Sequence, residues 1–264
     1  MMDTLYLRVG MREMWFAVGN GSRGDEFEVR RVAFKPDVSL NVNVHEALQT
    51  EPLAKGTYQS VHALCEGRAT LVPLSEFDED DCEDLYFFNF PGVRQRLRVL
   101  YDALPHQNAV LLFGASKDVC HTLQENYPQV LFQSVETPLL LHFASCSPRA
   151  LLRRRLFVNL MAGAMSLAAC KGGRIELYNA YALHHAQDAL YYTLHVAKVW
   201  GFDPATDEVF VSGERALAEG MAKSVAAYLP NVFVVRPEEE FSQTTLPGKG
   251  ALPYDFLNLL LRAF

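Results

Sequence analysis

The sequence predicts an α/β protein with two consecutive units, each a mixed β-sheet flanked by helices. Similar apolar hairpins open the two halves of the chain, at 5–9 with 14–18 and at 156–160 with 165–169. Strands and helices alternate after each hairpin, which is typical of mixed sheets covered by helices. Half of the 264 residues are hydrophobic, enough for two cores. We place the units at 1–150 and 151–264, as the products of an internal duplication.

The first half is predicted to begin with strands near 4–10, 13–19 and 26–34, with a turn at Gly19-Asn20-Gly21-Ser22. A short helix capped by Asn43 follows. The apolar segments 58–65 and 69–74 predict a hairpin. Helical spacing of five apolar residues predicts a helix from Val93 to Leu104. Strands at 109–113 and 130–135 then alternate with helices that begin at Ser116 and Thr137.

The second half shows its pattern more clearly. Three strands are predicted at 156–160, 163–170 and 174–181, followed by a helix at 187–200 that Gly201 ends. A strand at 208–211, a helix at 214–229 and a strand at 231–235 come next. An apolar helix at 252–264 completes this half. The order is three strands, helix, strand, helix, strand and helix.

Composition excludes several functional classes. The net charge of −7 disfavours general nucleic-acid binding, which needs a basic surface. The longest nearly apolar stretch, 156–170, is too short to span a bilayer, and no signal peptide is visible. The five cysteines are irregularly spaced, without a CxxC motif, and are interpreted as buried free thiols. We therefore expect a cytoplasmic protein.

Three motifs carry a family resemblance, at 87–91 (Phe-Phe-Asn-Phe-Pro), 188–192 (Asp-Ala-Leu-Tyr-Tyr) and 211–214 (Val-Ser-Gly-Glu). With them, nearly the whole chain resembles an uncharacterised Bacteroidetes family of unknown function, family 3822. The element order occurs in both halves of the chain, and this repetition resembles the ribonuclease-H-like duplication of the actin, sugar kinase and Hsp70 ATPase (ASKHA) superfamily. The resemblance implies a bacterial protein with an actin-like ATPase fold.

The superfamily resemblance also implies a nucleotide site in the cleft between the units. Active members place an acid at the end of the first strand of each half, and glycine-containing hairpins hold the phosphates. Here the acids are replaced by Arg8 and Asn159, and the adenosine loop corresponds to Ser212-Gly213. The candidate site for ATP or another anion consists of Arg8, Gly10, Asn159, Gly163, Ser166, Ser212, Gly213 and Glu214. A plain helix cap also explains the last three of these residues.

The replaced acids argue against catalysis. A cation about 4 Å from Mg²⁺ opposes it by roughly 8 kcal/mol at an effective dielectric constant of about 20. Arg8 could instead meet a phosphate or a carboxylate directly, and Asn159 supplies no charge. We therefore predict no catalytic and no metal-binding residues, and a binding or scaffolding module with a protein partner. The alternatives are an active ATPase or sugar-kinase-like phosphotransferase, and a homodimer with a merely structural cleft.

Two further clusters of residues are explained more simply by structure than by function. His184 and His185 could suggest a metal site with His195, but adjacent side chains point in different directions. The acidic residues between Glu76 and Asp84 are interpreted as a solvated loop. The alternative hypothesis is that they form an interaction surface. Possible basic complements are Arg94, Arg96, Arg98, Arg149, Arg153, Arg154 and Arg155.

Overall fold

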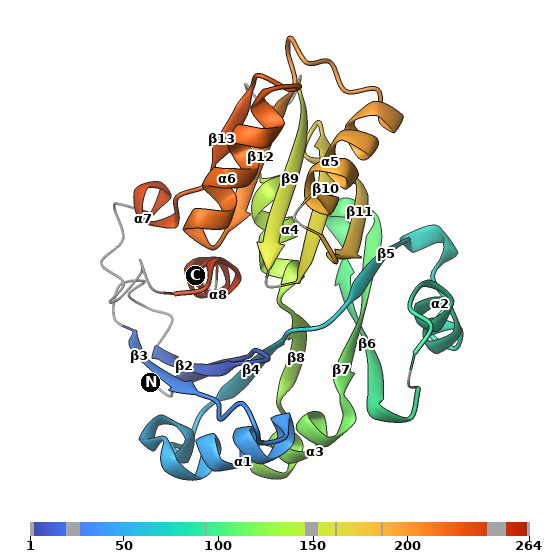
Figure 1. Ribbon diagram of the computed structural model, residues 1–264. Coiled ribbons are helices and arrows are strands. Elements are labelled where there is room, and N and C mark those ends of the chain that lie inside the picture. Colours follow the sequence, from blue (N-terminus) through green and yellow to red (C-terminus); the bar gives the residue numbers. More distant parts are fainter. Residues whose placement is uncertain are drawn as a thin grey trace. The chain divides into compact units, whose positions relative to one another are not determined.

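The computed structural model describes residues 3–19, 27–92, 94–145, 153–161, 163–185, 187–241 and 252–262 (Figure 1). The chain forms two compact units, Met1–Leu139 with Ser242–Phe264, and Leu140–Phe241. The first boundary lies at Leu139–Leu140, whereas the sequence analysis placed it at residue 150. The C-terminal helix, expected in the second unit, belongs to the first. Mixed sheets with helices confirm the α/β class.

The first unit is built on a five-stranded sheet in the order β3-β2-β1-β4-β8. Strands β1 to β3 are antiparallel, and β4 and β8 run parallel to β1. The strands are β1 (Thr4–Val9), β2 (Glu13–Gly19), β3 (Glu28–Ala33), β4 (Ser60–Cys65) and β8 (Leu131–Ser134). The predicted turn at 20–22 lies outside the described residues.

The two faces of this sheet follow from strand alternation. Leu5, Leu7 and Val9 of β1 face one side, where they pack in a core with α1 (Leu40–Thr50) and α3 (Lys117–Asn126). Arg8 faces the other side, where it meets Asp255 of α8 (Tyr254–Arg262). The sheet is thus covered by helices on both faces (Figure 1).

A second, three-stranded sheet completes the first unit, in the order β5-β7-β6. Helix α2 packs Tyr86 and Phe87 against Val110 and Leu112 of this sheet. Its elements are β5 (Ala69–Pro73), β6 (Leu97–Leu104), β7 (Ala109–Ser116) and α2 (Cys82–Asn89). Short 3₁₀ turns lie at Pro52–Lys55, Leu74–Glu76, Arg94–Arg96 and Pro105–Gln107.

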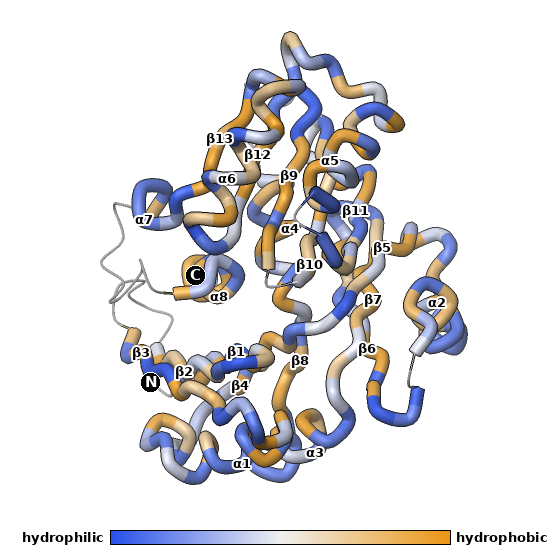
Figure 2. Tube along the Cα trace, viewed as in Figure 1, coloured by the Kyte–Doolittle hydropathy of each residue, from blue (hydrophilic) through white to orange (hydrophobic). Residues whose placement is uncertain are grey.

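The second unit contains a five-stranded sheet in the order β11-β10-β9-β12-β13. Helices α5 and α6 pack on the face that carries Leu156, Val158 and Leu160, and Phe143 of α4 stacks on Phe157 of the other face. The hydrophobic stretch of β9 contrasts with the hydrophilic α7 (Figure 2). The elements are the last five residues of α4 (Glu136–Ala144), β9 (Arg154–Met161), β10 (Ala164–Lys171), β11 (Arg174–Ala182), α5 (Asp188–Val199), β12 (Glu208–Gly213), α6 (Arg215–Ala226), β13 (Val232–Val234) and α7 (Pro237–Glu240).

The two five-stranded sheets have the same topology. In each sheet the first strand pairs antiparallel with the second and parallel with the fourth. The predicted opening hairpins are therefore β1 with β2 and β9 with β10. No helix among the described residues has the length and apolar character needed to cross a membrane.

Three predictions for the first half were wrong. Asn43 does not cap α1 but lies buried within that helix, whose N-cap residue is Ser39. The predicted helix at 93–104 is the strand β6, preceded by a 3₁₀ turn, and Val93 itself is not described. Pairing with the buried strand β7 outweighs the helical spacing of its apolar residues. The predicted hairpin at 58–74 is also absent, because β4 pairs with β1 and β8 whereas β5 pairs with β7 in the other sheet.

Candidate functional site

Arg8, in the first hairpin, forms an ion pair with a residue of the same unit. The guanidinium donates from Nε to Asp255 Oδ1 at 2.6 Å and from Nη2 to Asp255 Oδ2 at 2.8 Å. Both side chains are about nine-tenths buried. This two-bond geometry is the strongest form of arginine–carboxylate pairing. Of the two partners that the sequence left open for Arg8, the structure shows a carboxylate.

A second carboxylate, that of Glu66, adjoins the same hairpin. Glu66 Oε2 lies 3.8 Å from Arg8 Nη1 and accepts a hydrogen bond from the backbone amide of Met11 at 3.2 Å. The amide of Gly10 donates to the carbonyl of Glu13 at 3.0 Å. Both turn amides are thus bound to groups of the protein itself. A Cβ at Gly10 would lie 2.7 Å from Arg8 Nη1, so the glycine makes room for the ion pair.

The electrostatics of this hairpin do not suit magnesium-bound ATP. Burial by itself would lower the pKa of Arg8, but attraction and hydrogen bonds from Asp255 outweigh it and raise that pKa. The arginine is therefore a permanent cation that two carboxylates already neutralise. A phosphate placed here would face the negative charges of Asp255 and Glu66. The residues present consequently do not fit the triphosphate that the superfamily resemblance implies.

The second hairpin brings three predicted residues into one polar row. Asn159 of β9 lies opposite Ser166 of β10 and Ser212 of β12. The hydroxyl of Ser212 lies 3.0 Å from Asn159 Oδ1, to which it donates a hydrogen bond. Both serines are buried. The row is uncharged, and it lies on the sheet face opposite Leu160 and the helices α5 and α6.

Gly163 and Gly213, the two glycines of the second unit in the predicted site, differ in whether their surroundings require a glycine. Gly213 has φ of +127°, and a Cβ there would lie 2.3 Å from the carbonyl oxygen of Leu160, so the β12–α6 turn requires glycine. Gly163 has φ of +75° and open space beside it. Glu214 is the N-cap residue of α6, but its side chain makes no capping hydrogen bond.

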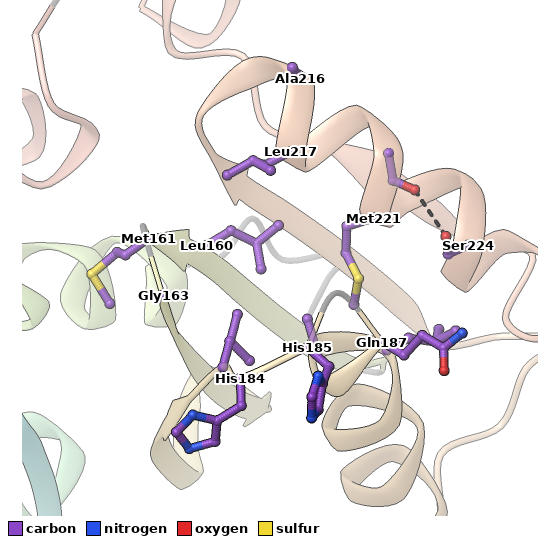
Figure 3. Close-up of a pocket in the computed structure, with 14 residues that line it drawn as sticks. Leu160, Met161, Gly163, His184, His185, Gln187, Ala216, Leu217, Met221 and Ser224 are labelled. Atoms are coloured by element: carbon purple, nitrogen blue, oxygen red, sulfur yellow. Dashed lines mark hydrogen bonds between the residues drawn. The ribbon is translucent and has the colours of Figure 1, made fainter.

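A pocket of about 480 Å³ lies in the second unit, beside Gly163. Figure 3 shows that its walls come from the end of β9, the segment before α5, and one face of α6. The sequence signals pointed to Gly163, His184 and His185 among the lining residues, but not to a pocket. The available signal was the series Ala216, Leu217, Gly220, Met221 and Ser224, which recurs at helical spacing along α6.

The histidines at the rim of this pocket are held by Asp188. The backbone amides of His184 and His185 both donate to Asp188 Oδ2 at 2.8 Å. These two bonds lower the pKa of Asp188. Within the described residues, no group of three or more histidine, cysteine or acidic side chains is arranged to hold a metal ion.

The basic residues considered as complements of the acidic run have various partners. Arg94 Nη1 lies 2.9 Å from Asp84 Oδ1, so it does meet this run. Arg153 instead pairs with Glu208 at 2.6 Å, and Arg98 donates to Gln124. Arg149 lies outside the described residues. The acidic run itself is largely exposed.

Comparison with solved structures defines the class of this protein. A protein from Bacteroides thetaiotaomicron VPI-5482, described as having an actin-like ATPase fold and unknown function, superposes with a TM-score of 0.85. It is 24% identical over 98% of this chain and 95% of its own length. The PilM-PilN type IV pilus biogenesis complex matches with a TM-score of 0.57 and 13% identity, covering 98% of each chain. The fold is therefore that of the actin-like ATPases.

The family follows from the sequence itself. Residues 2–232 match the family described as "Protein of unknown function (DUF3822)", and the chain belongs to that family. No curated protein matches the sequence. Both the family resemblance and the fold class expected from the sequence are confirmed.

Proposed function

We propose that this chain is a binding module with an actin-like fold that does not hydrolyse ATP. The observation that carries the proposal is the buried pair of Arg8 with Asp255. In the superfamily the corresponding first-strand position holds an acid that positions magnesium. Here the position carries a cation that is already neutralised, and a buried paired charge is costly to release.

The second hairpin supports the same proposal. Magnesium in phosphoryl-transfer sites is held by one or two carboxylates together with phosphate oxygens and water. Asn159 offers an amide oxygen that already accepts a hydrogen bond from Ser212. Neither hairpin therefore presents a free carboxylate at the position where the superfamily uses one. ATP binding, if measured, is expected to be weak and independent of magnesium.

A protein partner is part of the proposal. The fold occurs in the PilM-PilN complex, where one component binds another protein, although that likeness establishes the fold alone. Phe88 of α2 is 87% exposed and follows the exposed acidic run closely in the sequence, and we propose this segment as the partner surface. The buried free thiols Cys65, Cys82, Cys120 and Cys170 favour a reducing compartment, and we place the protein in the cytoplasm. Cys146 lies outside the described residues.

Isothermal titration with ATP, with and without magnesium, tests the proposal together with a phosphate-release assay. The expected result is neither tight magnesium-dependent binding nor released phosphate. An active member of the superfamily serves as the assay control. Tight magnesium-dependent binding with phosphate release would overturn the proposal and favour the active ATPase or sugar-kinase-like phosphotransferase. Light scattering of the same sample tests the homodimer.

A further inference from the structure

We propose that the pocket of the second unit binds an uncharged, largely apolar small molecule. Its volume of about 480 Å³ lies in the range of small-molecule sites, roughly 300–1,000 Å³. All described residues that line it belong to the second unit. The inference rests on the proposed role as a binding module, but it does not depend on the loss of ATP hydrolysis.

The interior of the pocket is apolar. Leu160 of β9 and Leu217 and Met221 of α6 line it, whereas the imidazoles of His184 and His185 point away from α6 (Figure 3). The hydroxyl of Ser224 donates to the carbonyl of Gly220 at 3.1 Å, so it is partly satisfied within the helix. Gln187 is an exposed polar residue at the edge of the lining. Such a lining favours apolar ligands with few hydrogen-bonding groups.

Charge argues against an anionic ligand. The described lining residues include no lysine and no arginine. The carboxylate of Asp188 accepts hydrogen bonds from the backbone amides of His184 and His185 at this rim. These amides are therefore not available to an anionic ligand. Transfer of an unpaired carboxylate or phosphate into this lining would lose its hydration without a compensating partner. The pocket therefore does not suit a nucleotide triphosphate.

Gly220 leaves room for a ligand at the α6 wall of the pocket. It lies within α6, where glycine weakens a helix, and it lines the pocket. Among the described residues, no atom lies within 4 Å of the position that its Cβ would take, so none of these neighbours requires a glycine there. The space above Gly220 instead widens the pocket. A bound molecule that packs against the helix backbone would make use of this space.

A pair of probes that differ by one charge tests the inference on the full-length protein. The neutral probe is 5-fluoroindole, and the charged probe is 5-fluoroindole-2-carboxylate, both followed by ¹⁹F NMR. The neutral probe is expected to bind at least about tenfold more tightly than the carboxylate, because the carboxylate must be desolvated. Absence of neutral-probe binding at millimolar concentration, or equal affinity for the two probes, would overturn the inference.

Substitutions on α6 assign the binding to the pocket. Gly220→Leu fills the open space and is expected to weaken neutral-probe binding about tenfold or more. Ala216→Leu, at another lining position, should act in the same direction. Lys223→Leu places the same side chain at an exposed position of the helix outside the lining, and should leave binding unchanged. Thermal unfolding checks that each variant is folded. Full binding by both lining variants would refute the site, whereas phosphate release from ATP would affect only the proposed loss of hydrolysis.

Discussion

Arg8 and Asp255 form a buried, two-bond ion pair that joins the first strand of the protein to its last described helix. The bonds measure 2.6 and 2.8 Å and link residues 247 positions apart in the sequence. The pair gives a structural reason for arginine at the end of β1. It also explains why α8 belongs to the first unit although it follows the second unit in sequence.

Replacement of Asp255 by asparagine should destabilise the protein by about 3 kcal/mol, because it leaves the buried cation of Arg8 without its main partner. Glu66, at 3.8 Å from Arg8, can compensate only in part. Denaturation with urea measures the change in the free energy of unfolding. The double variant Arg8→Met with Asp255→Leu is the control, and it should recover stability to within about 1 kcal/mol of the wild type. Unchanged stability of the single variant would show that the pair contributes little.

Asp102 should make stability depend on pH. Burial raises its pKa from 3.8 to about 6, against the lowering effect of hydrogen bonds from Thr137 and from the Ser134 amide at 2.9 Å. The folded state therefore binds more protons than the unfolded state between these two values. The contribution of Asp102 to stability falls by about 3 kcal/mol as pH rises through this window, and is constant above it.

The variant Asp102→Asn separates this effect from other titrations. The difference in unfolding free energy between wild type and variant, measured in urea at pH 4, 5, 6 and 7, should change most below about pH 6. NMR titration of the Asp102 carboxyl carbon reports its pKa directly. A measured pKa near the ordinary value of 3.8 would contradict the prediction.

Two glycines of the second unit should respond oppositely to alanine. Gly213→Ala should destabilise by at least about 2 kcal/mol, because φ is +127° and the new Cβ would meet the Leu160 carbonyl at 2.3 Å. Gly220→Ala should stabilise by about 1 kcal/mol, since it adds a better helix former in open space. Thermal and urea unfolding of both variants measure the contrast. Similar changes in the two variants would disprove the assigned backbone roles.

The second half was more predictable from sequence than the first. Its turns carry strong local signals, such as Gly172-Gly173 with positive φ between β10 and β11, and Gly201 with φ of +68° after α5. Local backbone preferences and the tertiary structure agree there. The same strand order in both five-stranded sheets is the relationship that an internal duplication would leave.

The first half contains segments whose partners are distant in sequence. Leu97, Leu100 and Leu104 have helical spacing, yet they lie in β6 because β7 provides the hydrogen bonds and the apolar surface. The chain from β4 to β5 passes between two sheets at Gly67, where a Cβ would lie 2.1 Å from the carbonyl oxygen of Gly114. Sequence windows of one element cannot detect such contacts.

The candidate site likewise has features that the sequence determined and features that only the tertiary structure decided. The residue types along the chain determined that the two first-strand positions carry Arg8 and Asn159 in place of acids, and that Gly10, Gly163 and Gly213 mark turns. Only the tertiary structure decided that Asp255 neutralises Arg8, that Ser212 donates to Asn159, and that α6 and the β9–β10 hairpin border a pocket. The physical reason is that strand periodicity and turn preference are local properties, whereas charge pairing and cavity shape depend on residues brought together from distant positions in the chain.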